Sequence, residues 1–231
     1  MKRIVEPEWL DELPTDNPGA VRSREDLRRI NFVMGNVEII ENMFLKAFPN
    51  AAPRKIMELG AGDGTFMLKL AQKLSPRWSN VEVVLVDRLK IISPETVQKL
   101  KQLGWRAEIV CADIFEWLSD CEPVDCVMAN LFLHHFEAEK LALLLCQVSS
   151  KSRLFLACEP RRSALALAGA RLLWLLGCNA VTRHDALVSV RAGFQGAEIS
   201  ELWPQEKVGE IEENDAGVFS HRFMAKRAAS T

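Results

Sequence analysis

A short glycine-rich segment, residues 58–65, constrains the fold of this chain more than any other feature. It reads Glu-Leu-Gly-Ala-Gly-Asp-Gly-Thr and directly follows a β-type run at Lys55–Leu59. Glycines in such a turn tolerate positive φ and let a ligand approach the backbone without meeting a Cβ. The helix predicted to begin at Thr65 adds free N–H groups and a partial positive charge. A strand, a glycine turn and a helix in this order predict a nucleotide-binding site in an α/β fold.

The sequence beyond the glycine turn keeps alternating between helical and β-type patterns. Helices are expected over residues 65–74, 94–103, 114–118 and 137–149, and strands over residues 81–86, 106–111, 124–129 and 154–158. Alternation of this kind builds a parallel, doubly wound sheet. Near the C-terminus, two strand-like runs at 196–202 and 219–226 are separated only by an acidic loop at 210–215. We therefore predict an α/β fold with a mostly parallel, doubly wound, seven-stranded sheet that ends in an antiparallel strand pair.

The first part of the chain differs from this alternating pattern. Residues 1–22 are interrupted by prolines and by the Asn17-Pro18-Gly19 turn, which predicts irregular structure. Ser23 is a good N-cap, and apolar residues then recur at helical spacing until Pro49 ends the helix. We expect an irregular segment and an N-terminal helical cap over residues 1–52, followed by one domain over residues 53–231.

Composition excludes several classes of protein. The net charge of −2 gives no basic surface of the kind that nucleic-acid binding needs, so no nucleic-acid partner is expected. Six cysteines without a CxxC pair predict reduced core thiols and no metal site. The acidic, proline-broken N-terminus predicts no signal peptide, hence a cytoplasmic protein. The most apolar stretch, residues 164–176, is too short to span a bilayer, so no integral membrane association is expected.

Four positions along the chain indicate which kind of nucleotide the predicted site binds. The dinucleotide-binding fingerprint has glycine or alanine at the position of Thr65, so the turn does not match that fingerprint. Asp87 ends the second strand, where an acidic residue can accept hydrogen bonds from ribose hydroxyls. Asp113-Ile114 follows the third strand, and Asn130–Phe136, with its His-His pair, follows the fourth. From residue 55 to about 160, this pattern resembles class I S-adenosylmethionine (SAM)-dependent methyltransferases, and most closely the ubiquinone- and menaquinone-type small-molecule enzymes.

The resemblance implies a Rossmann-like domain with SAM as cofactor and a helical insertion near residues 161–178. It also implies that Asp113 accepts a hydrogen bond from the adenine amine, while Ile114 packs on the ring. Asp113 on its own could equally cap the next helix. The SAM-binding residues implied in this way are Glu58, Leu59, Gly60, Ala61, Gly62, Asp63, Gly64, Thr65, Asp87, Arg88, Asp113, Ile114, Asn130 and Leu131.

Methyl transfer from SAM is an in-line displacement, so the protein must align donor and nucleophile. A general base is useful where the nucleophile loses a proton. The sequence has no tyrosine, and His134 and His135 follow the fourth strand, so one of them is the candidate catalytic base or substrate orienter. The alternative is a structural role for this pair, in which the rings hydrogen-bond a neighbouring loop. His184 is expected to cap or flank a helix, and His221 to lie in the core or at a sheet edge.

The segment from Pro160 to Cys178 is apolar on almost every side of a helix. It predicts a buried core helix, a lid over an apolar acceptor site, or a dimer or membrane-surface contact. We favour a small apolar or aromatic acceptor, such as a phenol, quinol or polyketide-like lipid, with O-methylation. Arg161 and Arg162 could meet an acidic group on it, or could simply be solvated.

Three other functions are consistent with parts of the sequence. Methylation of nucleic acid or protein is disfavoured. Amino-group methyltransferases that act on adenine or glutamine carry an Asn/Asp-Pro-Pro-aromatic signature, whereas Asn130 is followed here by Leu131-Phe132-Leu133. A non-catalytic SAM-binding scaffold or sensor is the main alternative, although the acids at 87 and 113 argue against it. A nicotinamide-dependent dehydrogenase is the remaining nucleotide-fold option. Whether the chain forms a homodimer is left open.

Overall fold

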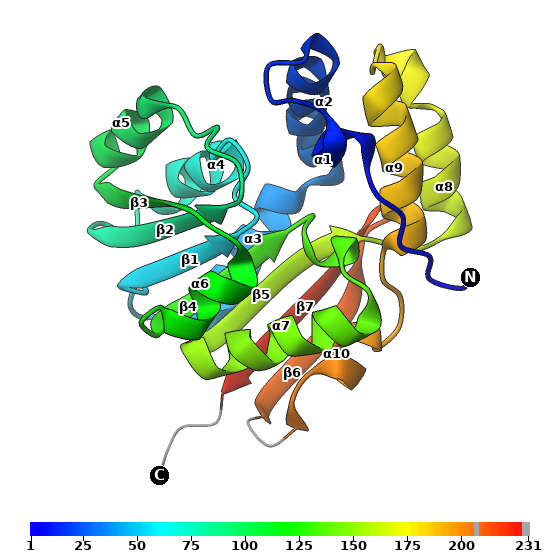
Figure 1. Cartoon of the computed structure of the whole chain (residues 1–231). Coiled ribbons are helices and arrows are strands. Elements are labelled where there is room, and N and C mark those ends of the chain that lie inside the picture. The colour runs from blue at the N-terminus through cyan, green and yellow to red at the C-terminus, as the bar shows by residue number, and fades with distance from the viewer. Residues whose placement is uncertain (206–207, 228–231) are drawn as a thin grey trace.

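The computed structural model, which describes residues 1–205 and 208–227, has a three-layer α/β/α architecture (Figure 1). Seven strands form one sheet in the order β3-β2-β1-β4-β5-β7-β6. Neighbouring strands from β3 to β5 are parallel, whereas β7 runs antiparallel to both β5 and β6. The strands are β1 (Lys55–Leu59), β2 (Val81–Asp87), β3 (Trp105–Cys111), β4 (Val124–Asn130), β5 (Ser152–Pro160), β6 (Val208–Ala216) and β7 (Ser220–Arg227). The predicted fold class is confirmed.

Helices cover both faces of the sheet. The helices are α1 (Trp9–Glu12), α2 (Pro18–Met34), α3 (Asn36–Ala47), α4 (Thr65–Leu74), α5 (Pro94–Gln102), α6 (Ile114–Asp120), α7 (Ala138–Lys151), α8 (Ala164–Arg171), α9 (Ala180–Ala192) and α10 (Glu198–Leu202), with 3₁₀ turns η1 (Leu133–His135) and η2 (Leu173–Leu176). One core joins α3, α4 and α5 to the sheet, and a second joins α6, α7 and α10 to its other face.

Side-chain alternation along the central strands explains why there are two cores. In β1, Ile56 belongs to the core under α3 and α4, whereas Met57 belongs to the core under α7. Both faces of β1, β2, β4 and β5 are buried, so these strands are almost continuously apolar, as parallel strands between two helical layers must be. The strand order reverses at β1, which lies between β2 and β4. Doubly wound sheets bind ligands at the carboxyl ends of the strands beside such a reversal.

The N-terminal helical cap is real, but its predicted form was wrong. Instead of one helix capped by Ser23, there are two helices, and α2 begins at Pro18 with Asn17 as its N-cap. Ser23 lies inside α2 and accepts a hydrogen bond from Thr182 of α9. Gly35, with φ of 68°, ends α2 and separates it from α3. The apolar periodicity continues across Gly35, which is why the sequence pattern did not reveal the break. Residues 9–12, predicted to be irregular, form the short helix α1.

The C-terminal strand pair is also real, but one of its strands was misplaced. Residues 198–202 form α10, and the acidic segment predicted as a loop is part of strand β6. Acidic side chains are tolerated there because β6 is the edge strand of the sheet, so one side of it meets solvent. One of them, Glu213, is held by His221 of β7. The last residues of the predicted domain, 228–231, lie outside the described residues.

We expect Gly35→Ala to destabilise the protein by about 1 kcal/mol, because alanine is strained at a positive φ. A Cβ at this position would meet nothing within 4 Å, so the loss comes from the backbone alone. Gly35→Asn, the matched control, is expected to lose less, because asparagine adopts the left-handed conformation more readily. Urea unfolding of the three proteins measures both differences. Equal stability of the alanine variant and the parent would contradict this account of the helix break.

Candidate functional site

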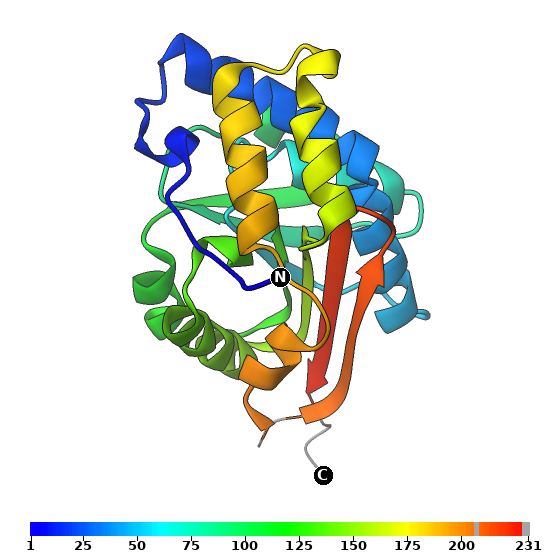
Figure 2. The same cartoon turned by 90° about the vertical axis from the view of Figure 1, so that its right-hand side faces the viewer.

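A cavity of about 960 Å³ lies at the carboxyl ends of the parallel strands. One part of its wall comes from the loops that follow β1, β2, β3 and β4, and the opposite part comes from the N-terminal segment, α2, α8 and α9. Figure 1 shows these covering helices standing above the edge of the sheet, and Figure 2 shows α8 and α9 side by side in front of α2. The cavity therefore lies between the sheet, which carries the glycine turn, and the helical cap.

The glycine turn after β1 forms part of the cavity wall. Gly60, Gly62 and Gly64 have φ angles of 68°, 55° and 73°, which favour glycine. A Cβ on Gly60 would lie 2.2 Å from the ring of Phe132, so Phe132 packs directly on the backbone there. A Cβ on Gly62 would meet nothing within 4 Å, and Gly62 lines the cavity. The turn thus leaves bare backbone exposed to the cavity.

Asp87, at the end of β2, braces this turn. Its Oδ2 accepts a hydrogen bond from Gly62 N at 2.8 Å, and its Oδ1 accepts one from Leu89 N at 2.8 Å. A carboxylate offers about four acceptor positions, so each oxygen can accept a further bond from a ligand hydroxyl. Asp87 is thus able to fix the glycine turn and to face the cavity at the same time.

Asp113 caps the helix that follows it, as the local sequence also allowed. Its Oδ1 accepts hydrogen bonds from Phe115 N and Glu116 N, at 2.8 and 3.4 Å. Asp113 and Ile114 nevertheless line the cavity, so the cap does not remove the carboxylate from it. The capping and cofactor interpretations are therefore compatible.

Glu58 is a buried carboxyl group that lines the cavity. Its Oε2 has no hydrogen-bond partner among the described residues. Burial, reinforced by the charges of Asp63 and Asp87, raises the pKa of Glu58 well above its ordinary value. A buried polar atom without a partner is rare in folded proteins and calls for an explanation. A cationic group of a ligand would supply the missing partner and would favour the ionised carboxylate.

The structure brings most of the predicted cofactor-binding residues to this one cavity. Two do not line it: Leu59 is buried in the core, and Gly64 is the N-cap of α4, next to Thr96. Those that line it are Glu58, Gly60, Ala61, Gly62, Asp63, Thr65, Asp87, Arg88, Asp113, Ile114, Asn130 and Leu131. Asp63 is paired with Arg28 of α2, and Arg88 with Asp11 of α1, which ties the cap to the sheet.

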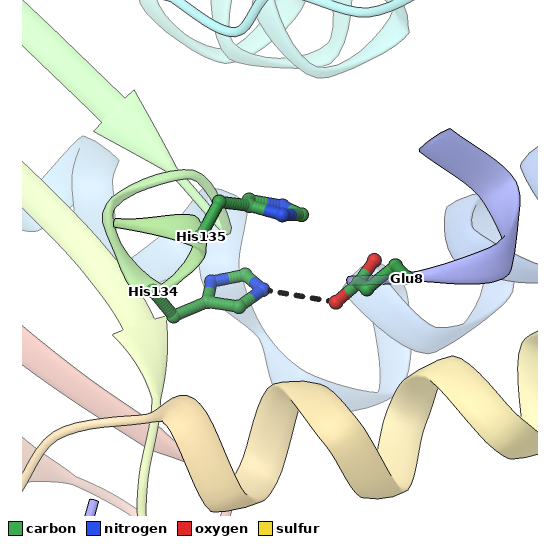
Figure 3. Close-up of side chains that lie close together, drawn as sticks. All are labelled: Glu8, His134 and His135. Atoms are coloured by element: carbon green, nitrogen blue, oxygen red, sulfur yellow. Dashed lines mark hydrogen bonds and ion pairs between the residues drawn. The ribbon is translucent and has the colours of Figure 1, made fainter. Parts of the chain in front are cut away.

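The two candidate catalytic histidines have different surroundings, although both line the cavity. The buried His134 ring donates from Nδ1 to Glu159 Oε2 at 2.8 Å. Its Nε2 donates to Glu8 Oε1 at 3.3 Å (Figure 3). Glu159 is itself held by three backbone N–H groups, from Phe132 to His134. His134 therefore joins the N-terminal segment to the end of β5.

These two carboxylates determine the charge of His134. Burial by itself lowers the pKa of the imidazole, but the hydrogen bonds and charges of Glu159 and Glu8 outweigh it and raise the pKa to about 9. Although burial raises the pKa of Glu8, its contacts with His134 and Ser189 bring it below the usual value. A ring protonated at neutral pH has no lone pair with which to accept a proton. This geometry favours a structural role for His134.

His135 is less buried and is held by one acidic partner. Its Nδ1 lies 3.3 Å from Asp11 Oδ2. A carboxylate on one ring nitrogen orients a histidine and leaves the other nitrogen for the cavity. Glu8, His134 and His135 also place possible metal-ligand atoms within 4.8 Å of one another. The raised pKa of His134 favours the protonated ring, which pairs with Glu8 and Glu159 and has no free lone pair for a metal ion.

The sequence analysis missed the part played by residues 1–12, here called the N-terminal strap. Much of the strap lines the cavity, and Arg3 donates to the Phe136 carbonyl at 2.8 Å. Asp185 of α9 accepts from the backbone N–H groups of Trp9 and Leu10. An acidic, proline-broken segment gives no sign of these contacts. The role of Glu159 could have been suspected from the sequence, because it lies near the end of the predicted fifth strand, at the edge of the sheet where ligands bind.

The predictions for the 160–178 segment were partly wrong. It is not one buried helix but α8 followed by η2, with several large apolar side chains exposed. Arg162 is buried and holds Gly193 O and Glu198, and Arg161 pairs with Asp215, so both arginines have structural partners. His184 lies within α9 and stacks on Trp9, whereas His221 is buried, as expected. All six cysteines are free, but two of them, Cys111 and Cys146, are exposed and so are not core thiols.

Residues 56–151 match a protein family described as a methyltransferase domain. No curated protein matches the chain. Among solved structures, the plantazolicin methyltransferase BpumL in complex with SAH is similar, with 16% identity, a TM-score of 0.64, and 92% of each chain covered. An O-methyltransferase family protein from Burkholderia thailandensis has 15% identity and a TM-score of 0.64, over 93% of this chain and 62% of that one. Magnesium protoporphyrin IX methyltransferase from Synechocystis PCC 6803 has 16% identity and a TM-score of 0.55, over 95% and 91%.

At these identities the solved structures establish the fold, and the family match establishes the domain. The chain has the fold of class I, SAM-dependent methyltransferases, and its residues 56–151 match a methyltransferase domain. The predicted enzyme class and cofactor are confirmed. The closer resemblance to ubiquinone- and menaquinone-type enzymes stays a prediction. Among the described helices, none combines the length and hydrophobicity needed to cross a bilayer.

The raised pKa of His134 predicts a pH dependence of stability. Its stabilising effect is complete below pH 6.5, the ordinary pKa, and is lost as pH rises through about 9. The loss amounts to roughly 3 kcal/mol, by the conversion of pKa shift to free energy. Urea unfolding between pH 6.5 and 9.5 measures it. His134→Gln should remove the contribution of His134 to this loss, whereas His221→Gln should keep that contribution and lose only the one from the raised pKa of His221 itself. If an NMR titration of the folded protein gave His134 a pKa near 6.5, this account would be wrong.

Proposed function

We propose that this chain transfers a methyl group from SAM to an oxygen of a small apolar or aromatic acceptor. The observation that carries the proposal is the two-sided lining of one cavity. The predicted donor-binding residues lie on its sheet side, and apolar side chains of the cap lie opposite, among them Leu27, Ile30, Ala166, Leu173 and Val190. A pocket lined in this way suits an apolar molecule with few polar groups.

The donor side fits SAM in charge and in shape. The bare backbone of Gly60–Gly62 admits a ligand, and Asp87 has acceptor positions left for ribose hydroxyls. Both cap bonds of Asp113 use Oδ1, which leaves Oδ2 for an adenine amine, next to Ile114. The unpartnered Glu58 oxygen suits the cationic methionyl end of the donor. When bound, SAM supplies an activated methyl group, and the chain supplies position and orientation.

We assign to His135 the role of the base that removes the proton from the acceptor hydroxyl. It lies on the cavity wall with one ring nitrogen against Asp11, so its other nitrogen can accept a hydrogen bond from an acceptor hydroxyl. In the transfer, the acceptor oxygen would form its bond to the methyl carbon as the methyl–sulfur bond of the donor breaks and SAH leaves, while His135 would take the hydroxyl proton and the Asp11 carboxylate would stabilise the imidazolium. His134 serves beside it as a positioning residue, because it fixes the strap that carries Asp11.

Donor binding provides a test centred on Glu58. A cation near Glu58 favours its ionised form, so SAM binding should release a proton and tighten as pH rises toward the raised pKa of the free protein. Calorimetry in buffers of different ionisation enthalpy measures this release. Glu58→Gln should abolish it and weaken SAM binding by roughly 10- to 100-fold, the value of a charge-assisted hydrogen bond. Glu116→Gln, a change on the exposed face of α6, should leave both unchanged.

Two results would contradict this donor site. No binding of SAM or SAH to the parent protein would remove it altogether. Equal SAM affinity and equal proton release in the Glu58→Gln variant would leave the donor but would remove the assigned role of Glu58.

Turnover provides the test of the acceptor. Alkyl-substituted phenols should be methylated, and small charged acceptors should not, when the product is identified by mass spectrometry. His135→Gln should lower kcat by roughly 10²- to 10⁴-fold, which is typical for loss of a general base. Because the pKa of a phenol falls when electron-withdrawing groups are added, activated phenols should recover part of the lost rate.

The control is Glu116→Gln, the change on the exposed face of α6, which should keep kcat. An unchanged kcat in His135→Gln would remove its assigned role. SAM binding without turnover on any acceptor of this class would favour the scaffold or sensor function instead.

A further inference from the structure

A patch of apolar side chains is exposed at the end of the helical cap. It consists of Leu172, Trp174, Leu175 and Leu176, here called the apolar tip, and these residues are 52%, 57%, 62% and 55% exposed. They lie in or beside η2, in the turn that connects α8 to α9, which Figure 2 draws in yellow at the end away from the C-terminus. Single exposed apolar residues are common, but a contiguous group of them marks an interaction surface.

The backbone of the apolar tip is held in place. Cys178 N donates to Leu173 O, and Gly177, in the left-handed conformation, ends η2. Asn179 N then donates to Asp26 of α2 at 2.8 Å, which fastens the turn to the neighbouring helix. The exposed side chains are therefore presented by an ordered turn.

The apolar tip continues into the proposed acceptor side of the cavity. Leu176 belongs to both, and Leu173, its neighbour in η2, lines the cavity together with Leu27 of α2. Leu176 therefore connects the exposed apolar tip with the apolar wall of the cavity. This continuity favours a surface from which apolar molecules are delivered.

Cationic side chains flank the apolar tip. Arg171 immediately precedes it, Arg22 of α2 donates to Gly177 O, and Arg183 of α9 follows one turn after it. All three are exposed, and within residues 1–205 and 208–227 none of them pairs with a carboxylate. The neighbouring acid, Asp26, is buried and already bound by Arg29 and Asn179. The surface thus combines an apolar centre with a positively charged rim.

We propose that the apolar tip docks this protein on an anionic lipid bilayer. Trp174 and the leucines enter the interface between head groups and acyl chains, while the three arginines meet lipid phosphates. A second copy of the chain is a poorer partner, because a twofold contact through the same surface would bring the arginines of both copies together. The proposal goes beyond the proposed function, since neither SAM nor an acceptor is needed for docking.

Vesicle co-sedimentation of the full chain tests the docking. Vesicles that contain phosphatidylglycerol should bind it, and binding should weaken with salt and be much weaker on pure phosphatidylcholine. Trp174→Ser with Leu175→Ser should lower the partition coefficient at least about tenfold, as burial of two large apolar side chains implies. Leu143→Ser, which removes an equally exposed leucine from α7, should have no effect. Arg22, Arg171 and Arg183 changed to Gln should remove most of the salt dependence.

A depth measurement sharpens the test. Brominated lipids should quench fluorescence in the parent protein, and Trp174→Phe should lose that quenching while it keeps vesicle binding. SAM binding by the Trp174→Ser, Leu175→Ser protein shows that it is folded, because neither residue lines the cavity.

Three outcomes would overturn the proposal. The first is no binding of the parent protein to anionic vesicles at low salt. The second is equal binding by the tip variant and the Leu143→Ser control. The third is a dimer in light scattering that the tip changes dissociate, without vesicle binding, which would make the tip a dimer interface. None of these outcomes bears on SAM binding or turnover, so the proposed function is tested separately.

Discussion

The contact on which the cavity most depends is the buried set formed by His134 and its two carboxylates. Glu159 comes from the end of β5, His134 from the turn after β4, and Glu8 from the N-terminal strap. A buried carboxylate is unfavourable unless it is paired, and here one imidazolium pairs two of them. The protonated His134 thus links the strap to the sheet at this point. Removing either partner would leave a buried charge alone, which is more destabilising than the net value of the contact.

The cap is fastened to the sheet by similar polar contacts around the cavity. Asp11 pairs with Arg88, and Asp63 with Arg28, so each link joins the cap to a loop that follows a strand. Apolar contacts dominate elsewhere, in the two cores on either side of the sheet. Polar links around a cavity can separate with less loss of buried apolar area than a core contact would. Ligand entry is thus compatible with an intact sheet.

The sequence predicted well where local chemistry and tertiary structure demand the same residues. The glycine turn needs positive φ at Gly60, Gly62 and Gly64, and this demand is visible in the residue types alone. It predicted poorly where the partner is distant in the chain. Nothing near Glu8 indicates that His134, 126 residues away, will be its partner. Gly35 was overlooked because apolar periodicity continues through it, and the edge position of β6 made an acidic strand look like a loop.

In the proposed function, the residues of the cavity that bind the donor differ from those that accelerate the reaction. The methionyl ammonium of the donor is unchanged by the reaction, so a contact with Glu58 would hold donor and product alike. Such uniform binding lowers KM but does not raise kcat. Acceleration must come from groups whose interaction grows as the methyl moves, namely the alignment imposed by the cavity walls and the Asp11–His135 pair, which gains a charge as the acceptor loses its proton. Because Asp11 lies on the strap, the Asp11–His135 pair forms only while the strap stays in this place, where His134, Arg3 and Asp185 all hold it.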